Sequence, residues 1–242
     1  MMGMPITVEV VDAGAGPDVI EMAFAYFQYV DEKFSTYKDT SEISRINRRE
    51  LPLDAYSQDM QTIFVLAEQT RQETDGYFDI VQDGRYDPSG IVKGWAIFNA
   101  AQLLRQNGCE NFYVDAGGDI QVAGKNGQGQ AWRVGIRSPF NPTEIVKVLR
   151  VSDCGVATSG TYIRGQHIYN PKQRGQLIAD IVSLTVVGPD IYEADRFATG
   201  AFAMGRKGIE FIARLEGFEG YMIDAQGQAT YTSGFERYVS HD

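Results

Sequence analysis

The order of hydrophobic patterns along the chain is the feature that most constrains its fold. Apolar residues recur with helical spacing in residues 17–34, 57–74 and in a segment that ends at Gly108, whereas residues 112–187 contain mainly short β-branched runs. One strand is expected earlier, at residues 6–11, and two helices later, at residues 191–204 and 208–215. Because helical and strand patterns are grouped, the chain is predicted to adopt an α+β fold with mixed sheets and packed helices.

Smaller elements are expected between these segments. Ser41 or Thr40 can cap a short helix that ends near Asn47, and residues 77–80 have the composition of a short strand. The dipeptide Asn126-Gly127 is typical of a β-hairpin turn. No G-x-G-x-x-G motif opens a helix and no G-x-x-x-x-G-K-[ST] motif is present, which disfavours a Rossmann dehydrogenase or a P-loop enzyme.

Length and charge limit the classes of function. The 242 residues, 43% of them hydrophobic, are predicted to form a single domain over residues 1–242. The net charge of −10 disfavours nucleic-acid binding, because an acidic surface repels a phosphate backbone. A polyphosphate ligand would therefore need a metal ion or backbone amides.

Little in the sequence indicates export or a transition-metal site. The N-terminal residues lack the basic and apolar regions of a signal peptide, and no segment is apolar enough to span a membrane. Two cysteines and two histidines are too few for a disulfide framework or a histidine-based metal site. A cytoplasmic protein is expected.

The segment of residues 193–200 is a candidate metal site. Asp195 and Thr199 are four residues apart and would share one face of a helix. A carboxylate and a hydroxyl are hard oxygen ligands of the kind that Mg²⁺ prefers. The same spacing also occurs by chance, with an exposed aspartate and a threonine that bonds its own helix backbone.

Further polar motifs could bind phosphate or move a proton. Residues 87–94 place Lys93 and free backbone amides at the start of a helix, where anions bind. The Gly117-Gly118 pair allows a ligand to approach the backbone closely. His167 could accept a proton near neutral pH. An ordinary capped turn, a hairpin and a structural histidine remain open alternatives.

The motifs gain weight because they occur in one order that resembles the ApbE family of FAD:protein FMN transferases. Each motif matches a family element in its residue pattern and in its position along the chain. The matching segments are residues 2–5 (MGMP), 35–47 (STY…SEISRIN), 76–80 (GYFDI), 87–94 (DPSGIVKG), 116–120 (AGGDI), 159–162 (SGTY), 167–171 (HIYNP) and 183–199 (SLTV…ADRFAT).

The resemblance implies a T-fold-like architecture and Mg²⁺-dependent transfer of FMN from FAD, as substrate, to a Thr or Ser hydroxyl of an acceptor protein, with release of AMP. It implies that Gly90, Asp195 and Thr199 hold Mg²⁺ and that His167 is the catalytic base. It assigns the FAD contacts to a longer set, in which Tyr37 lies against the flavin ring: Met2, Tyr37, Tyr77, Phe78, Asp79, Asp87, Lys93, Gly117, Gly118, Asp119 and Ile168.

Two other functions remain open. Mg²⁺-dependent hydrolysis of FAD to FMN and AMP would use the same site if water replaced the acceptor hydroxyl. A non-catalytic FAD-binding protein is suggested by the short segment 81–86 before Asp87 and by Ala198, where relatives often have an acid. The identity of the acceptor protein and the oligomeric state cannot be predicted.

Overall fold

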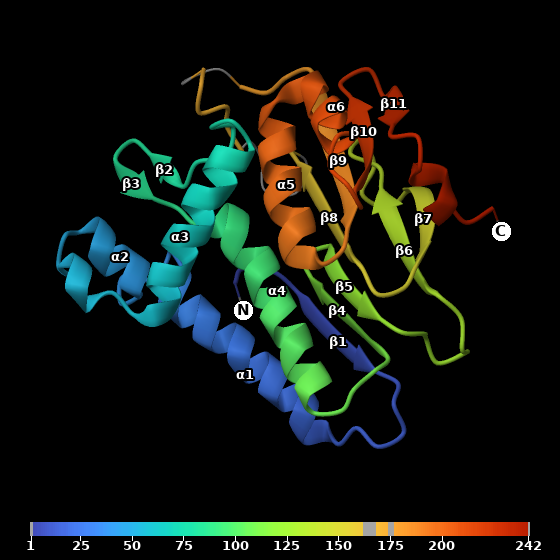
Figure 1. Cartoon of the computed structure of the whole chain (residues 1–242), viewed down its shortest axis with the longest axis horizontal. Helices are drawn as coiled ribbons and strands as arrows, with labels where there is room; N and C mark the ends of the chain where they lie inside the picture. The colour runs from blue at the N-terminus through green and yellow to red at the C-terminus, as the bar shows by residue number, and fades with distance from the viewer. Residues whose placement is uncertain (1, 162–167, 174–176, 242) are drawn as a thin grey trace.

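The computed structural model describes residues 2–161, 168–173 and 177–241, and within them an antiparallel sheet is the central layer (Figure 1). Seven strands form it in the order β1-β4-β5-β8-β9-β10-β11. Their bounds are β1 Ile6–Val10, β4 Phe112–Ala116, β5 Asp119–Ala123, β8 Gly155–Gly160, β9 Ile181–Gly188, β10 Glu219–Asp224 and β11 Ala229–Tyr231. Every pairing is antiparallel, and short turns join β4 to β5 and β10 to β11.

Helices cover one face of this sheet and enclose the larger hydrophobic core (Figure 1). They are α1 Pro17–Phe34, α2 Glu42–Asn47, α3 Gln58–Glu73, α4 Ser89–Gln106, α5 Ile191–Ala203 and α6 Gly208–Ile212, with short 3₁₀ turns at Leu53–Ala55 and Gly205–Lys207. Pro17 opens α1, and the Ser57 hydroxyl caps α3 by accepting a hydrogen bond from the Met60 N–H. The fully buried Phe27 and Phe202 belong to this core, which fixes the helices on the sheet.

The opposite face of the sheet is covered by a two-stranded sheet of β6 Trp132–Arg137 and β7 Ile145–Val151, and the 3₁₀ turn Phe235–Tyr238 packs beside it (Figure 1). Alternate residues of β6 point into a second, smaller core with Phe235 at its centre. The molecule therefore has three layers: helices, the large sheet and the small sheet.

The predicted α+β class is confirmed, and most predicted elements match the observed ones. The strand predicted at residues 77–80 is wrong, because the Phe78 N–H donates to the Thr74 hydroxyl and the Asp79 carboxylate accepts from the Val81 N–H instead of pairing with a strand. The pairing that does occur lies just beyond, in a small hairpin of β2 Val81–Gln82 and β3 Arg85–Tyr86.

The hairpin predicted at Asn126-Gly127 is also wrong. The turn forms, with the Asn126 N–H donating to the Gln130 carbonyl, but it joins β5 of the large sheet to β6 of the small sheet. A turn sequence specifies a local reversal of the chain, and it does not specify whether the flanking strands pair.

Within residues 2–161, 168–173 and 177–241, no helix is both long and apolar enough to cross a membrane.

Candidate functional site

A cleft opens where the start of α4 meets the middle of α5. It is lined from five parts of the chain: the segment after α3, the first turns of α4, the β4–β5 turn, the end of β8 with residues 168–171, and α5. The lining residues are Tyr77, Phe78, Asp79, Gln82, Asp87, Ser89, Gly90, Lys93, Gly117, Thr158, Ser159, Gly160, Ile168, Tyr169, Pro171, Asp195 and Thr199. Most of the residues predicted for the site therefore come together.

The predicted metal ligands lie at the crossing of α4 and α5. Asp195 and Thr199 are one turn apart on α5, as their spacing predicted, and both face the first turns of α4. The Thr199 hydroxyl donates to the Gly90 carbonyl at 3.4 Å, and Asp195 Oδ2 accepts from the Gly94 N–H at 2.7 Å. These two contacts place a carboxylate, a hydroxyl and a main-chain carbonyl at one edge of the cleft.

Glycine permits this close crossing. A Cβ at Gly94 would lie 2.6 Å from Asp195 Cβ, and one at Gly155 of β8 would lie 2.2 Å from the backbone N of Ile191, where α5 begins. Any larger residue at either position would push α5 away from α4 or from the sheet. The close approach of α5 to its neighbours is therefore a direct consequence of these two glycines.

The Asp195 carboxylate belongs to a cluster of three charged groups. Lys93 Nζ forms an ion pair with the Asp119 carboxylate and lies 3.7 Å from Asp195 Oδ1. Asp119 Oδ1 also accepts from the Thr158 N–H at 3.0 Å. Asp195 and Asp119 are only 3% and 1% exposed. Burial raises the pKa of Asp195, and the Asp119 carboxylate raises it further, against the opposing effect of Lys93.

These residues fit a Mg²⁺ ion. Two buried carboxylates face one lysine, so with all three ionised the cluster has an excess negative charge that a cation would neutralise. Within the described ranges, no group of three or more His, Cys, Asp or Glu side chains forms a metal cage. Mg²⁺ does not need such a cage, because it is commonly held by one or two carboxylates together with substrate phosphates.

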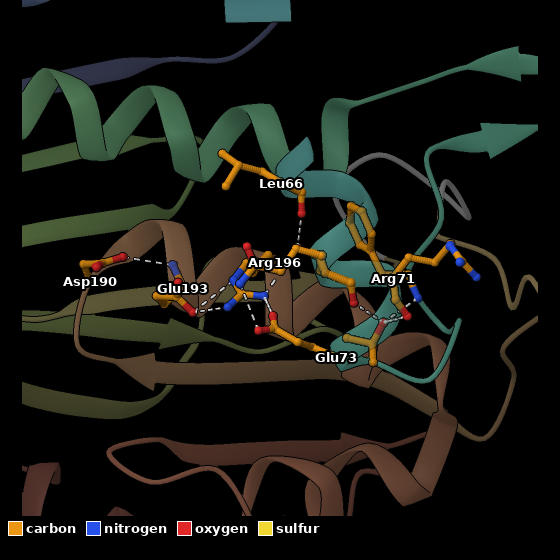
Figure 2. Close-up of polar contacts among 10 residues, drawn as sticks. Leu66, Arg71, Glu73, Asp190, Glu193 and Arg196 are labelled. Atoms are coloured by element: carbon orange, nitrogen blue, oxygen red, sulfur yellow. Dashed lines mark hydrogen bonds and ion pairs between the residues drawn. The ribbon is translucent and has the colours of Figure 1, made fainter. Parts of the chain in front are cut away.

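An ion-pair network fixes α5 against α3. Figure 2 shows Arg196, the neighbour of Asp195, reaching between Glu193 of its own helix and Glu73 at the end of α3. Arg196 Nη2 lies 2.5 Å from Glu193 Oε2, and the Arg196 side chain is only 5% exposed. Its guanidinium also stacks 3.9 Å from the centre of the Phe197 ring. The network holds α5 against α3 and so helps to fix the positions of Asp195 and Thr199 in the cleft.

The segment of residues 168–172 is held against the segment that follows α3. The Tyr169 hydroxyl lies 3.1 Å from the carbonyl oxygens of both Asp79 and Val81. Lys172 Nζ lies 2.7 Å from Asp75 Oδ2 and 4.2 Å from the centre of the Tyr77 ring. The segment of residues 168–172 is therefore tied to the segment after α3, and both segments line the cleft.

The model of the ApbE family matches residues 2–83 and 81–222, which together cover most of the chain. The chain belongs to the ApbE family.

Curated ApbE relatives are named FAD:protein FMN transferase. The Salmonella typhimurium protein is 31% identical over 163 residues, which cover 64% of this chain and 45% of that protein. The Escherichia coli K12 protein is 32% identical over 155 residues, which cover 60% of this chain and 44% of that protein. The matched part of this ApbE chain thus spans a little under half the length of these relatives.

Solved ApbE structures share the fold. The flavin transferase ApbE from Vibrio cholerae superimposes with a TM-score of 0.83 at 22% identity, over 98% of this chain and 96% of that one. The ApbE protein from Thermotoga maritima gives 0.87 at 20% identity, over 99% and 97%. At these identities the likeness establishes the ApbE-like fold that the sequence predicted.

Some residues expected from the ApbE resemblance lie away from the cleft lining. Tyr37 is 97% exposed on the loop before α2, so its ring is accessible for stacking. Met2 packs against the larger core, and Gly118 is on the β4–β5 turn but outside the lining. His167 falls outside the described residues. The roles assigned to these residues stay predictions.

Two parts of the ApbE site were not found from the sequence. Arg196 lies inside a matched motif, and its spacing of three residues from Glu193 is the signal that could have revealed it. The Lys93–Asp119 ion pair had no comparable signal. Both residues were expected to contact FAD independently, whereas in the structure they contact each other.

Proposed function

We propose that this protein binds FAD together with Mg²⁺ and transfers the FMN half to a Thr or Ser hydroxyl of an acceptor protein, with release of AMP. FAD is the substrate and Mg²⁺ the cofactor in this proposal. The names of the ApbE relatives support it, although the match covers less than half of their length.

One observation carries the proposal: the Gly90 carbonyl, the Asp195 carboxylate and the Thr199 hydroxyl line one cleft. These groups would hold Mg²⁺, and at neutral pH a molecule with a net charge of −10 would otherwise repel a diphosphate. Bound Mg²⁺ would supply Lewis-acid neutralisation of the diphosphate charge.

The chain's own groups would bind and orient the substrate. The start of α4 lines the cleft, and helix N-termini attract phosphate. Lys93 adds a positive charge at the same place. Tyr77 lines the cleft as a half-buried aromatic side chain, and the buried Phe78 ring packs beside Gly90. Positioning and charge neutralisation of this kind account for most of the catalysis of phosphoryl transfer.

The proposed reaction exchanges one ester link for another. The acceptor hydroxyl oxygen bonds to the flavin-side phosphorus, while the bond from that phosphorus to the bridging oxygen breaks and AMP leaves with that oxygen. The hydroxyl proton passes to a base, for which the family resemblance implies His167.

Incubation of the protein with FAD and Mg²⁺, with and without a threonine-containing acceptor peptide, tests the proposal. Covalent flavin on the peptide together with AMP is the expected result. AMP formed equally well without the peptide would instead indicate FAD hydrolysis. Bound FAD without AMP would indicate a binding protein, and no FAD binding at all would contradict every one of these functions.

The binding-only alternative has weaker support in the structure than in the sequence. Ala198 is fully buried in the helix-side core and is not among the described residues that line the cleft. The absence of an acid at position 198 thus takes no ligand from the cleft as described. The short segment 81–86 forms the ordered β2–β3 hairpin, whose Gln82 lines the cleft.

A pair of histidine variants tests the proposed base. His167→Ala should leave FAD binding intact and slow transfer by roughly a hundredfold, the usual range for general-base catalysis. His241→Ala is the matched control, because it removes the only other histidine, which is exposed near the C-terminal end of the described residues. Loss of FAD binding in His167→Ala would give His167 a structural role instead.

A further inference from the structure

Asn47 makes an unusual pair of contacts next to the cleft. Its side-chain amide donates to the Tyr86 carbonyl at 2.9 Å, and its side-chain oxygen accepts from the Tyr86 N–H at 2.8 Å. The two groups of one side chain therefore satisfy both polar groups of one backbone residue, as a neighbouring strand would. The residues are 39 positions apart, so the contact joins the end of α2 to β3.

The α2 end of this contact is firmly anchored. Glu42, in the first turn of α2, accepts hydrogen bonds from the Ser57 N–H at 2.7 Å and from the Ser57 hydroxyl at 2.6 Å. The Ser41 cap also donates from its hydroxyl to the Ser35 carbonyl at 2.7 Å. Asn47 thus projects from a short helix that is fixed at its start to α3 and to the loop that contains Tyr37.

The β3 end leads directly to the predicted metal-binding turn. Tyr86 is followed by Asp87, whose N–H donates to the Ile80 carbonyl at 2.7 Å. Asp87 Oδ1 accepts from the Ser89 N–H at 3.0 Å, which shapes the turn at the start of α4. Gly90, whose carbonyl contacts the Thr199 hydroxyl, is only four residues beyond Tyr86.

The hairpin that contains Tyr86 is also held by the Asp87 N–H bond to the Ile80 carbonyl and by the Tyr169 hydroxyl at the Val81 carbonyl, but neither contact reaches the Tyr86 backbone groups. β2 and β3 pair over only two residues each, and a hairpin of that length is not stable on its own. The Tyr86 ring adds an edge contact with Phe64, with ring centres 4.7 Å apart, but this contact does not orient the backbone. The two Asn47 hydrogen bonds are the contacts that fix the direction of the Tyr86 backbone.

We propose that Asn47 is a positioning residue that sets the Gly90 carbonyl relative to Asp195 and Thr199, through Tyr86 and the Asp87 turn. Asn47 itself is outside the lining of the cleft, and it lines an adjoining hollow that shares Gln82 and Asp87 with the cleft. Because it projects from the helix that follows the Tyr37 loop, it also fixes the separation between that loop and the metal-binding turn. The metal-binding part of this inference rests on the proposed function.

Two readouts in Asn47→Ala test the inference. The first is amide hydrogen exchange of residues 85–94 in the ligand-free protein. It should become faster than in the wild type by about tenfold or more when the two Asn47 hydrogen bonds are lost. The second is AMP release from FAD at increasing Mg²⁺, for which the half-saturating Mg²⁺ concentration should rise by about tenfold. A purely stabilising residue would lower activity equally at every Mg²⁺ concentration.

The controls distinguish loss of the two Asn47 hydrogen bonds from a general loss of stability. Asn107→Ala removes an asparagine that also donates to a backbone carbonyl, that of Leu103, but at the exposed end of α4. It should change neither readout. Asn47→Asp keeps the side-chain shape and the acceptor for the Tyr86 N–H but sets a carboxylate oxygen against the Tyr86 carbonyl. Changes at least as large and in the same direction are therefore expected, and this variant decides the matter if Asn47→Ala does not fold.

Unchanged exchange of residues 85–94, or an unchanged half-saturating Mg²⁺ concentration, would overturn the inference. Failure of the proposed function would be seen separately, as an absence of AMP release in the wild-type protein itself. In that case the exchange measurement still decides whether Asn47 fixes the Asp87–Gly90 turn.

Discussion

Replacement of Gly94 by alanine tests whether the close crossing of α4 and α5 builds the site. The new Cβ would lie 2.6 Å from Asp195 Cβ and 2.8 Å from the Ile191 carbonyl oxygen. Carbon atoms in contact are normally about 3.5–4.0 Å apart, so α5 must move away by about 1 Å. The carbonyl belongs to the backbone and cannot rotate aside as a side chain could.

Two opposing effects set the change in the free energy of unfolding. Alanine in place of glycine inside a helix stabilises it by about 1 kcal/mol. Overpacking of a well-packed core costs about 1–3 kcal/mol, and the clash with backbone places Gly94→Ala in the upper part of that range. We therefore expect the free energy of unfolding to fall by about 1–2 kcal/mol.

Urea denaturation at equilibrium measures this loss, and Mg²⁺-dependent AMP release measures the effect on the site. A displacement of about 1 Å can slow an enzyme by roughly a hundredfold. Gly90→Ala is the matched control for stability on the same helix face, because its nearest contact would be 3.2 Å, with the Thr199 methyl group. A Gly94→Ala protein as stable in urea as the wild type, or less destabilised than Gly90→Ala, would refute the argument.

Three further predictions concern charges and thiols. Asp195→Asn keeps an acceptor for the Gly94 N–H but removes a buried charge. Because burial raises the folded-state pKa of Asp195, its ionisation costs the wild type stability as the pH rises above about 4, the unfolded value. In thermal melts without Mg²⁺, the melting temperature of the variant should therefore rise relative to that of the wild type as the pH increases. Added Mg²⁺ should not stabilise the variant. A variant that is less stable than the wild type at pH 8, or that Mg²⁺ still stabilises, would count against this assignment. Arg196→Met leaves two glutamates without their shared cation and should lower the free energy of unfolding by about 2 kcal/mol in urea; an unchanged midpoint would mean that the network does not hold α5. Burial raises the pKa of both thiols, for Cys154 to about 12, so mass spectrometry after maleimide treatment at neutral pH should find Cys109 and Cys154 unmodified in the folded protein and modified in urea; rapid labelling of the native protein would contradict their burial.

Local chemistry in the sequence was enough to predict most helices and strands. Pro17 starts α1, and the hydroxyls of Ser41 and Ser57 cap α2 and α3, as side-chain capping within three residues predicts. The four-residue spacing of Asp195 and Thr199 likewise placed both on one face of α5. Such features depend on residues that are neighbours in the chain, so their geometry follows from the helix itself.

The site needed contacts that no local pattern contains. Asn47 meets Tyr86 across 39 positions, and Arg196 meets Glu73 across 123. The order of strands in the large sheet was equally hidden, because the turn at Asn126-Gly127 specifies a reversal and leaves the pairing partner open. The sequence by itself determined the elements and, through the order of its motifs, the family. Only the tertiary structure decided which charges share a buried cluster, because burial and partner choice depend on how the whole chain closes on itself.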